Sequence, residues 1–302
     1  MSPYLQNLMG IAGASDVYSK ANDLFSHFLR IQVSISGVFR ICNALGRNLD
    51  PVLAETCFEP IEVASTDVVY ASMDGSMVQT DDGYKEVKAG RIWVSSDITA
   101  NGNTRNRITK SQYSAHLGHY SAFLPKFEAS LSSYQLGEAP LVFITDGATW
   151  IQDYTTSHYP NGTHILDYFH AVERLHTFSS TVGLSKSWFD EQCNVLKSDG
   201  VLPVLATLRC LVYTDSVSLS ARNTLLTYYE NNTDRMNYPS YLKRGLCIGN
   251  GAMEAANRTL VQTRCKRSGQ RWSEQGVNHI LNLRCAWQSN NWTCVTKLLV
   301  EH

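Results

Sequence analysis

The sequence predicts an α/β fold built on a mixed β-sheet. From residue 66 to about 117, β-branched and aromatic residues recur in strand-like stretches, and "DDGY" (81–84) between the first two is a hairpin-turn signal. From residue 139 the pattern changes to short, continuous apolar runs, "APLVFITDG" and "THILDYFH", separated by a helical stretch. Such runs are typical of strands buried on both faces and joined by helical crossovers. Two or three antiparallel strands are therefore expected to precede helix, strand, helix and strand.

The first 62 residues are expected to be helical. "SKANDLFSHFL" and "ISGVFRICNALGRN" show helical spacing and are joined by the short link "RIQVS". This arrangement fits a helix-turn-helix that binds DNA, and it fits equally a plain helical hairpin that packs on the main domain. The sequence does not separate the two.

Two strands are expected in "TDVVYASMDGSMV" and "KEVKAGRIWVSSD", and a third, if there is one, in "ITKSQYSAHL", which follows the polar stretch "ITANGNTRNR", rich in glycine and asparagine. Residues 119–136 predict a helix that Pro125 breaks. "TWIQDYTTSHYP" predicts another helix, and 171–245 is helical throughout. The predicted segments are a helical N-terminal region (1–62), the first part of the core (63–170), an all-helical insertion (171–246) and a last segment with a helix and basic residues (247–302).

Composition indicates an ordinary globular chain. Of 302 residues, 43% are hydrophobic and 18% charged, and no apolar run is long enough to span a membrane. Without a signal-peptide pattern, the chain is expected to be cytoplasmic and to have no membrane partner. The eight cysteines show no CxxC spacing, so neither a zinc ribbon nor a disulfide framework is predicted.

The net charge of −1 argues mildly against nucleic-acid binding, but local clustering of basic residues matters more than the total. Five basic residues fall within fourteen positions near the C-terminus, where they could contact DNA phosphates or simply form a solvated surface: Arg258, Arg264, Lys266, Arg267 and Arg271.

Two aspartates follow apolar strands, and each is followed by glycine. They are Asp74, after "VVYASM", and Asp146, after "LVFIT". Ligands bind at the carboxyl ends of strands in open α/β sheets, and two carboxylates held close together require a cation between them. Magnesium prefers such oxygen ligands. The alternative is turn chemistry, in which aspartate bonds to its own backbone and glycine takes a positive φ.

Glu254 in "IGNGAMEAANR" is the candidate third carboxylate. With Gly251 as N-cap, it would be the third residue of a helix, where glutamate complements the helix dipole and needs no other explanation. The small residues around it, however, would let this helix end approach a sheet closely, and Arg258 follows one turn later.

Four long strings, in order, resemble the ISKra-type bacterial insertion-sequence transposases, which are related to the Mutator-like group. They are "MDGSMVQTDDGYKEVKAGRIW", "VFITDGATWI", "THILDYFHAVERL" and "IGNGAMEAANRTLVQTRCKRSGQRWS". The resemblance covers about 66–288 and extends more loosely to the N-terminal helices. It implies an RNase H-like core with a helical insertion before the last catalytic helix. It also implies a metal-binding Asp-Asp-Glu triad, Asp74, Asp146 and Glu254, that holds two Mg²⁺ ions, with Mn²⁺ as a substitute.

The resemblance further implies cleavage and strand transfer of DNA at insertion-sequence ends by a homo-oligomer bound to transposon ends and target DNA. Asp167 and His170 are similar to an auxiliary [CD]xxH motif of the wider group. A zinc site formed by His170, Glu173 and His176 is disfavoured because its spacing matches no zinc motif. The alternatives are an inactive or truncated remnant that acts as a DNA-binding protein, and a nuclease with the same core but no strand transfer.

Overall fold

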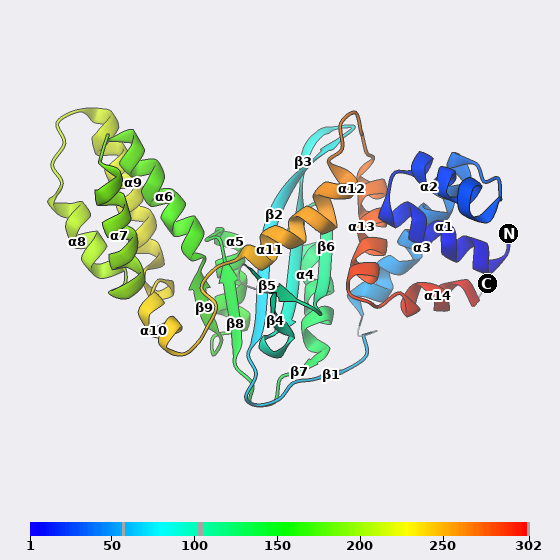
Figure 1. Cartoon of the computed structure of the whole chain (residues 1–302), viewed down its shortest axis with the longest axis horizontal. Coiled ribbons are helices and arrows are strands. Elements are labelled where there is room, and N and C mark those ends of the chain that lie inside the picture. Colours follow the sequence, from blue (N-terminus) through cyan, green and yellow to red (C-terminus); the bar gives the residue numbers. More distant parts are fainter. Residues whose placement is uncertain (56–57, 102–104, 301–302) are drawn as a thin grey trace. The chain divides into compact units, whose positions relative to one another are not determined.

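The computed structural model describes residues 1–55, 58–101 and 105–300, and the chain divides into two compact units (Figure 1). Unit 1 comprises Met1–Leu141 and Ala252–His302, and unit 2 comprises Val142–Gly251. The boundaries of these units differ from those of the predicted segments. Unit 1 contains both the N-terminal helices and the first strands, and unit 2 contains residues 142–170 together with the helical block. Antiparallel pairing in unit 1 and parallel pairing in unit 2 confirm the mixed α/β class.

Three antiparallel strands form the sheet of unit 1, in the order β6-β3-β2. β2 spans Val69–Thr80, β3 spans Gly83–Val94 and β6 spans Gln112–Leu117. The predicted hairpin is confirmed, because only two residues separate β2 from β3 and Gly83 takes a φ of 102° at the end of the turn. The predicted third strand is confirmed as β6.

The polar stretch before β6 forms a small hairpin. β4 (Ile98–Asn101) pairs antiparallel with β5 (Arg105–Ile108), and the tip between them lies outside the described residues. Two further short strands, β1 (Ile61–Glu62) and β7 (Tyr134–Gln135), pair parallel.

Helix α4 (Tyr120–Ser132) covers one face of this sheet and contains Pro125 without ending there. The predicted break was wrong. Proline removes one helical hydrogen bond, but packing of the helix on the sheet outweighs that loss. Phe123 and Phe127 are fully buried, and the Phe127 ring lies so close to Gly90 of β3 that a side chain at Gly90 would overlap it.

α13 (Glu274–Gln288) lies along the edge strand β6, where its Asn278 side chain bonds to the Leu117 backbone, and it also packs on the N-terminal helices. These are α1 (Pro3–Ser15), α2 (Tyr18–Leu24) with its π-helical continuation Phe25–Leu29, and α3 (Ile35–Ala54). α14 (Thr293–Val300) packs on α1 and α3. Gly46 permits the close contact of α3 with α13, because a Cβ there would lie 2.2 Å from the His279 carbonyl oxygen. The N-terminal helices therefore share a core with the sheet, as the helical-hairpin alternative expects, and DNA binding by them stays a prediction.

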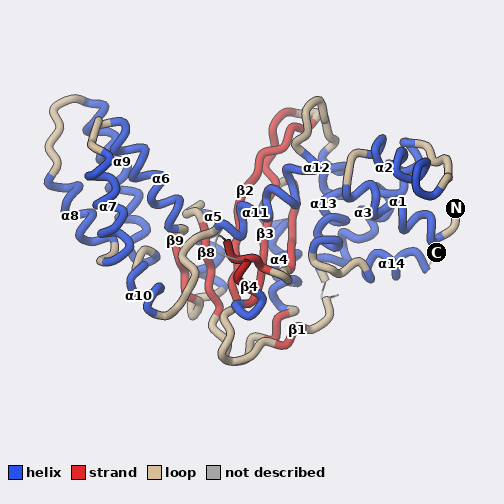
Figure 2. Tube along the Cα trace, in the orientation of Figure 1, coloured by secondary structure: helices blue, strands red, loops and turns tan. Residues whose placement is uncertain are grey.

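Unit 2 begins with two parallel strands joined by a helix and continues as a helical block (Figure 2). β8 (Leu141–Thr145), α5 (Thr149–His158) and β9 (Thr163–Leu166) confirm the predicted order of strand, helix and strand. The block consists of α6 (Tyr168–Thr181), α7 (Lys186–Ser198), α8 (Val201–Cys210), α9 (Ser216–Asn232), a 3₁₀ turn (Thr233–Arg235) and α10 (Tyr238–Lys243). No helix in the described part of the chain has the length and apolar character needed to cross a bilayer.

His116 on β6 makes the stability of unit 1 sensitive to acid. Burial, together with the charge of Lys126, lowers the pKa of His116 to about 4, against the opposing effect of Asp50. As the pH falls from 6.5 towards 4, the unfolded chain therefore takes up a proton at this position that the folded chain does not. We expect this group to cost about 2 kcal/mol of stability over that interval, allowing for its partial exposure to solvent.

The measurement is urea unfolding of wild type and of His116→Gln between pH 7 and pH 4.5. The variant should lose less stability on acidification than wild type does. Replacement of the exposed His27 by glutamine is the control and should leave the acid loss unchanged. Equal acid losses in wild type and His116→Gln would contradict the assignment.

Candidate functional site

Asp74 lies within β2, six residues before its end, and not at the strand end that the sequence predicted. It pairs with Ala89 of β3. One oxygen of its carboxylate accepts a hydrogen bond from the Gly75 amide, at 2.7 Å, and the other accepts one from the Asn257 side-chain amide. Gly75 continues the strand and does not take a positive φ, and the atom nearest to a Cβ there would be the end of the flexible Glu86 side chain. The turn explanation therefore fails for Asp74-Gly75.

The helix that carries Glu254 lies against this part of the sheet. It consists of α11 (Gly251–Ala256), a π-helical segment (Asn257–Gln262) and α12 (Thr263–Cys265), which follow without interruption. Its start is tied to β3 by the Arg91 guanidinium, which donates to the Ala252 carbonyl at 2.8 Å. Met253, Ala256 and Asn257 face the protein interior, whereas Gly251 and Ala255 are exposed, so of the small residues around Glu254 only Ala256 is buried against the rest of unit 1.

Glu254 lies in the first turn of α11 with its side chain exposed. The helix begins at Gly251, so Glu254 is its fourth residue and not the third. Residues three apart are neighbours on a helix surface, so Glu254 lies one turn before Asn257, whose amide contacts Asp74. Unit 1 thus brings the strand of one predicted carboxylate to the helix of another, 180 residues away in sequence.

Asp146 and Asp167 are neighbours in unit 2. They directly follow Thr145 and Leu166, which are register partners in the parallel strands β8 and β9. Asp146 therefore leaves its strand at the carboxyl end, as predicted. Its Oδ1 accepts from the Ala148 amide at 3.1 Å and Gly147 takes a φ of 93°, so the turn geometry of the alternative explanation is also present.

Asp167 is fully buried and is the N-cap of α6. Its carboxylate accepts hydrogen bonds from the amides of Phe169 and Asn250 and from Nδ1 of His170, at 3.2, 2.9 and 2.5 Å. The strand expected through "DYFH" was wrong, because β9 ends at Leu166 and the capping bonds start a helix there. His170 lies in the first turn of that helix, with 36% of its side chain exposed. Asp167 is thus a positioning residue for His170.

The five basic residues near the C-terminus do not share one environment. Arg258, Lys266 and Arg271 are exposed. Arg267 is half-buried and ion-paired with Asp16 at 2.5 Å. Arg264 is 1% exposed, and its position corrects the expectation that it lies on a phosphate-binding surface.

The guanidinium of Arg264 lies over the rings of Tyr18 and Trp272, 4.6 and 4.9 Å from their centroids, and donates to the Gly13 carbonyl at 3.0 Å. These contacts join α12 to the N-terminal helices. Cation–π contacts to two rings compensate for burial of the charge, which is why this arginine is in the interior. Its role in this structure is to hold unit 1 together.

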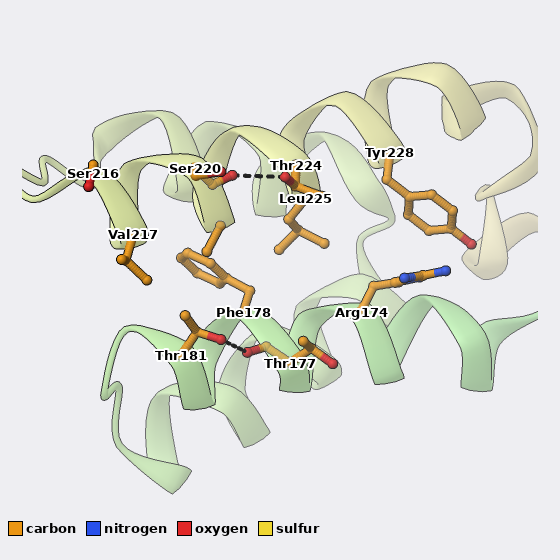
Figure 3. Close-up of a pocket in the computed structure, with 11 residues that line it drawn as sticks. Arg174, Thr177, Phe178, Thr181, Ser216, Val217, Ser220, Thr224, Leu225 and Tyr228 are labelled. Carbon is orange, nitrogen blue, oxygen red and sulfur yellow. Dashed lines mark hydrogen bonds between the residues drawn. The ribbon is translucent and has the colours of Figure 1, made fainter.

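A cavity of about 630 Å³ lies between α6 and α9 of unit 2 (Figure 3). Arg174 is its charged residue, and the Arg174 guanidinium lies 5.4 Å from the centre of the Tyr228 ring. The remaining lining is apolar or carries hydroxyl groups: Thr177, Phe178, Thr181, Ser216, Val217, Ser220, Ala221, Thr224 and Leu225. None of the candidate carboxylates lines this cavity, so the sequence-predicted chemistry lies elsewhere.

The oxygen atoms at and beside Asp74 are of the kind that bind a hard divalent cation. In the described ranges, no three His, Cys, Asp or Glu side chains are grouped as a metal ion would need. Amide oxygens of asparagine also serve as ligands of hard cations. Asn257 is 5% exposed, and its Oδ1, beside the Asp74 carboxylate, has no hydrogen-bond partner. A carboxylate and an unpartnered amide oxygen are the kind of ligands that Mg²⁺ prefers. Sequence reasoning missed Asn257, although its position three residues after Glu254 was a usable signal.

The fold and site define an α/β protein with carboxylates on β2, on α11 and at the end of β8. No protein-family model matches the chain, and the comparison with curated proteins finds no match.

Proposed function

We propose that the protein is a transposase that cleaves and transfers DNA strands with the help of divalent metal ions, using Asp74, Asp146 and Glu254 on an RNase H-like core. One observation carries the proposal. The Asn257 amide bonds the Asp74 carboxylate, and this contact brings the helix of Glu254 to the strand of Asp74. The four motifs that resemble the ISKra-type transposases supply the rest of the argument.

Two Mg²⁺ ions, or Mn²⁺ in their place, would activate an attacking oxygen and stabilise the leaving 3′-oxygen. Asp74, Asp146 and Glu254 would bind them. The attacking oxygen is that of water in the cleavage step and a DNA 3′-hydroxyl in strand transfer. In each step the attacking oxygen forms a new bond to phosphorus as the bond from phosphorus to the leaving 3′-oxygen breaks. Cleavage thus leaves a 3′-hydroxyl and a 5′-phosphate, whereas strand transfer forms a new phosphodiester and releases a 3′-hydroxyl of the target.

The exposed Arg258, Lys266 and Arg271 would contact backbone phosphates and position the DNA. His170, oriented by Asp167, is the auxiliary group next to the strand ends of unit 2. The partners are transposon ends and target DNA, with the protein acting as a homo-oligomer on them.

Glu254→Gln is expected to lower metal-dependent DNA cleavage about a hundredfold or more, since loss of a metal-binding carboxylate removes several kcal/mol of transition-state stabilisation. The assay uses DNA that carries the sequences flanking the gene, with and without Mg²⁺. Exposed Glu191 on α7 supplies the matched control, and Glu191→Gln should cut like wild type. Wild-type cleavage by Glu254→Gln would refute the triad.

A second candidate is a DNA-binding protein without catalysis, an inactive relative of such transposases. It is favoured by the Asp74 carboxylate, of which both oxygens already accept hydrogen bonds from amide groups. It predicts DNA binding that weakens steeply with salt and no metal-dependent cutting by wild type. A nuclease with the same core would cut the DNA but leave the 3′-ends unjoined.

A further inference from the structure

Asn257 is a buried amide with only half of its hydrogen-bonding capacity used. Its Nδ2 donates to one carboxylate oxygen of Asp74, while its Oδ1 has no partner. The side chain is 5% exposed, at the first residue of the π-helical segment and one turn after Glu254. A buried acceptor without a partner costs about 1–3 kcal/mol, so this arrangement calls for a reason.

The hydrogen bond to Asp74 fixes which way the amide points, since an oxygen of the Asp74 carboxyl group accepts from Nδ2. If the amide were turned over, its oxygen would face a carboxylate oxygen, and the two would repel. A half-turn about the last side-chain bond nevertheless exchanges nitrogen and oxygen without moving the backbone. A divalent cation between the two oxygens would convert that repulsion into shared coordination.

The spacing suits such an exchange. Two neighbouring ligands on an octahedral Mg²⁺, each about 2.05 Å from the ion, are about 2.9 Å apart, which is also an ordinary hydrogen-bond distance. The groups now joined by the Asn257–Asp74 hydrogen bond are therefore close enough to share one ion with little movement.

We propose that Asn257 is an oxygen ligand of the same divalent cation as Asp74, and that its amide turns over when the ion binds. Without the cation, Nδ2 neutralises part of the charge on Asp74; with it, Oδ1 gains a partner. The proposal rests on the proposed function for the identity of the cation, Mg²⁺ or Mn²⁺. Ligands that are all oxygen favour these ions over Zn²⁺.

The competing role is positioning alone, in which Nδ2 keeps its bond to Asp74 and never touches the ion. The two roles make opposite predictions for Asn257→Asp. In this variant the side chain at position 257 no longer has an N–H group to donate to Asp74, but it still has an oxygen that can bind the ion and it carries an added negative charge. It should therefore strengthen metal binding if Asn257 is a ligand, and weaken it if Asn257 only orients Asp74.

The test measures Mn²⁺ binding to the full chain by titration calorimetry, with the metal-induced rise in the unfolding midpoint as a second readout. The variants are Asn257→Asp, Asn257→Leu and Asp74→Asn. Asn278→Asp is the matched control, because both amide atoms of Asn278 already have partners in the Leu117 backbone. This control should be less stable than wild type but bind Mn²⁺ equally well.

We expect Asp74→Asn and Asn257→Leu to bind Mn²⁺ at least about tenfold more weakly than wild type, and Asn257→Asp to bind it about tenfold more tightly because ligand charge raises affinity. The midpoint of Asn257→Asp should rise more with Mn²⁺ than that of wild type. If the leucine variant does not fold, the aspartate variant still decides between the roles.

Weaker binding by Asn257→Asp, affinities equal to wild type in both Asn257 variants, or no Mn²⁺ binding by wild type would each overturn the proposal. Because the assay contains no DNA, its result does not depend on whether the protein cleaves DNA. DNA cleavage that needs Glu254 but not Asn257 would refute the ligand role alone. Mn²⁺ binding through Asp74 and Asn257 without DNA cleavage would refute the proposed function alone.

Discussion

Replacing Arg284 with leucine is expected to lower the free energy of unfolding by about 3–5 kcal/mol, because it leaves several buried acceptors without a donor. Arg284 on α13 is 7% exposed. It donates to the carbonyls of Leu260 and Thr259 in the π-helical segment, to the Ala14 carbonyl of α1 and to the Thr263 hydroxyl.

The guanidinium is suited to this place by its geometry. A planar fork with five donors can serve several oxygens at once, which a lysine ammonium cannot do in the same plane. Burial lowers the pKa of Arg284 to about 10, so it remains charged at neutral pH. Because it holds the carbonyls of the segment that begins with Asn257, it also fixes the helix that carries Glu254.

Urea unfolding of Arg284→Leu, Arg284→Lys and wild type measures the effect. The lysine variant should recover only part of the loss. Arg209→Leu is the control, since Arg209 is 59% exposed in a surface pair with Glu230 and its loss should cost less than about 1 kcal/mol. A loss in Arg284→Leu no larger than in the control would contradict the structural role.

Lys126→Met is expected to lower the free energy of unfolding by about 3 kcal/mol. This is near the lower end of the range for breaking a buried ion pair, because the partner Asp50 is partly exposed. Lys126 on α4 is 3% exposed, and its ammonium donates to Asp50 at 2.7 Å and to Asn282 at 2.9 Å. Asn282 in turn donates to Asp50 and to the Gly46 carbonyl. This network joins α4, α3 and α13.

The same network determines the pKa of Asp50. Partial burial alone would raise it, but the hydrogen bond and charge of Lys126 and the hydrogen bond from Asn282 hold it below its ordinary value. A lowered carboxyl pKa contributes stability above the unfolded pKa, and that contribution is lost as the pH falls through the folded pKa. In Lys126→Met this acid-sensitive part of the stability should disappear.

Unfolding by urea at pH 7 compares Lys126→Met with Lys126→Met/Asp50→Asn. The double variant should be the more stable of the two, because no carboxylate is left without its counter-charge. Lys186→Met is the matched control, since Lys186 pairs with Asp190 on the exposed surface of α7 and should contribute about 0.5 kcal/mol or less. If the double variant is no more stable than Lys126→Met, the pair is not the source of the effect.

The sequence predicted those elements whose signal is local. The turn residues at 81–84 specified the β2–β3 hairpin, because loop length and a positive φ at Gly83 are properties of adjacent residues. The apolar runs specified β8 and β9, and helical periodicity specified the block that follows. The same local reasoning was wrong about Pro125, where packing of α4 on the sheet outweighs one missing hydrogen bond.

For the candidate site, the sequence alone identified Asp74, Asp146 and Glu254 as groups with suitable chemistry, and the position of Asp146 at the end of a strand. Tertiary structure decided which groups meet. It placed Asp74 within β2, brought Asn257 to it from 183 residues away and took Arg264 out of the basic cluster into the core. Neighbouring residues in the chain set periodicity and turn type, whereas burial and contacts between distant residues depend on how completed helices and strands pack.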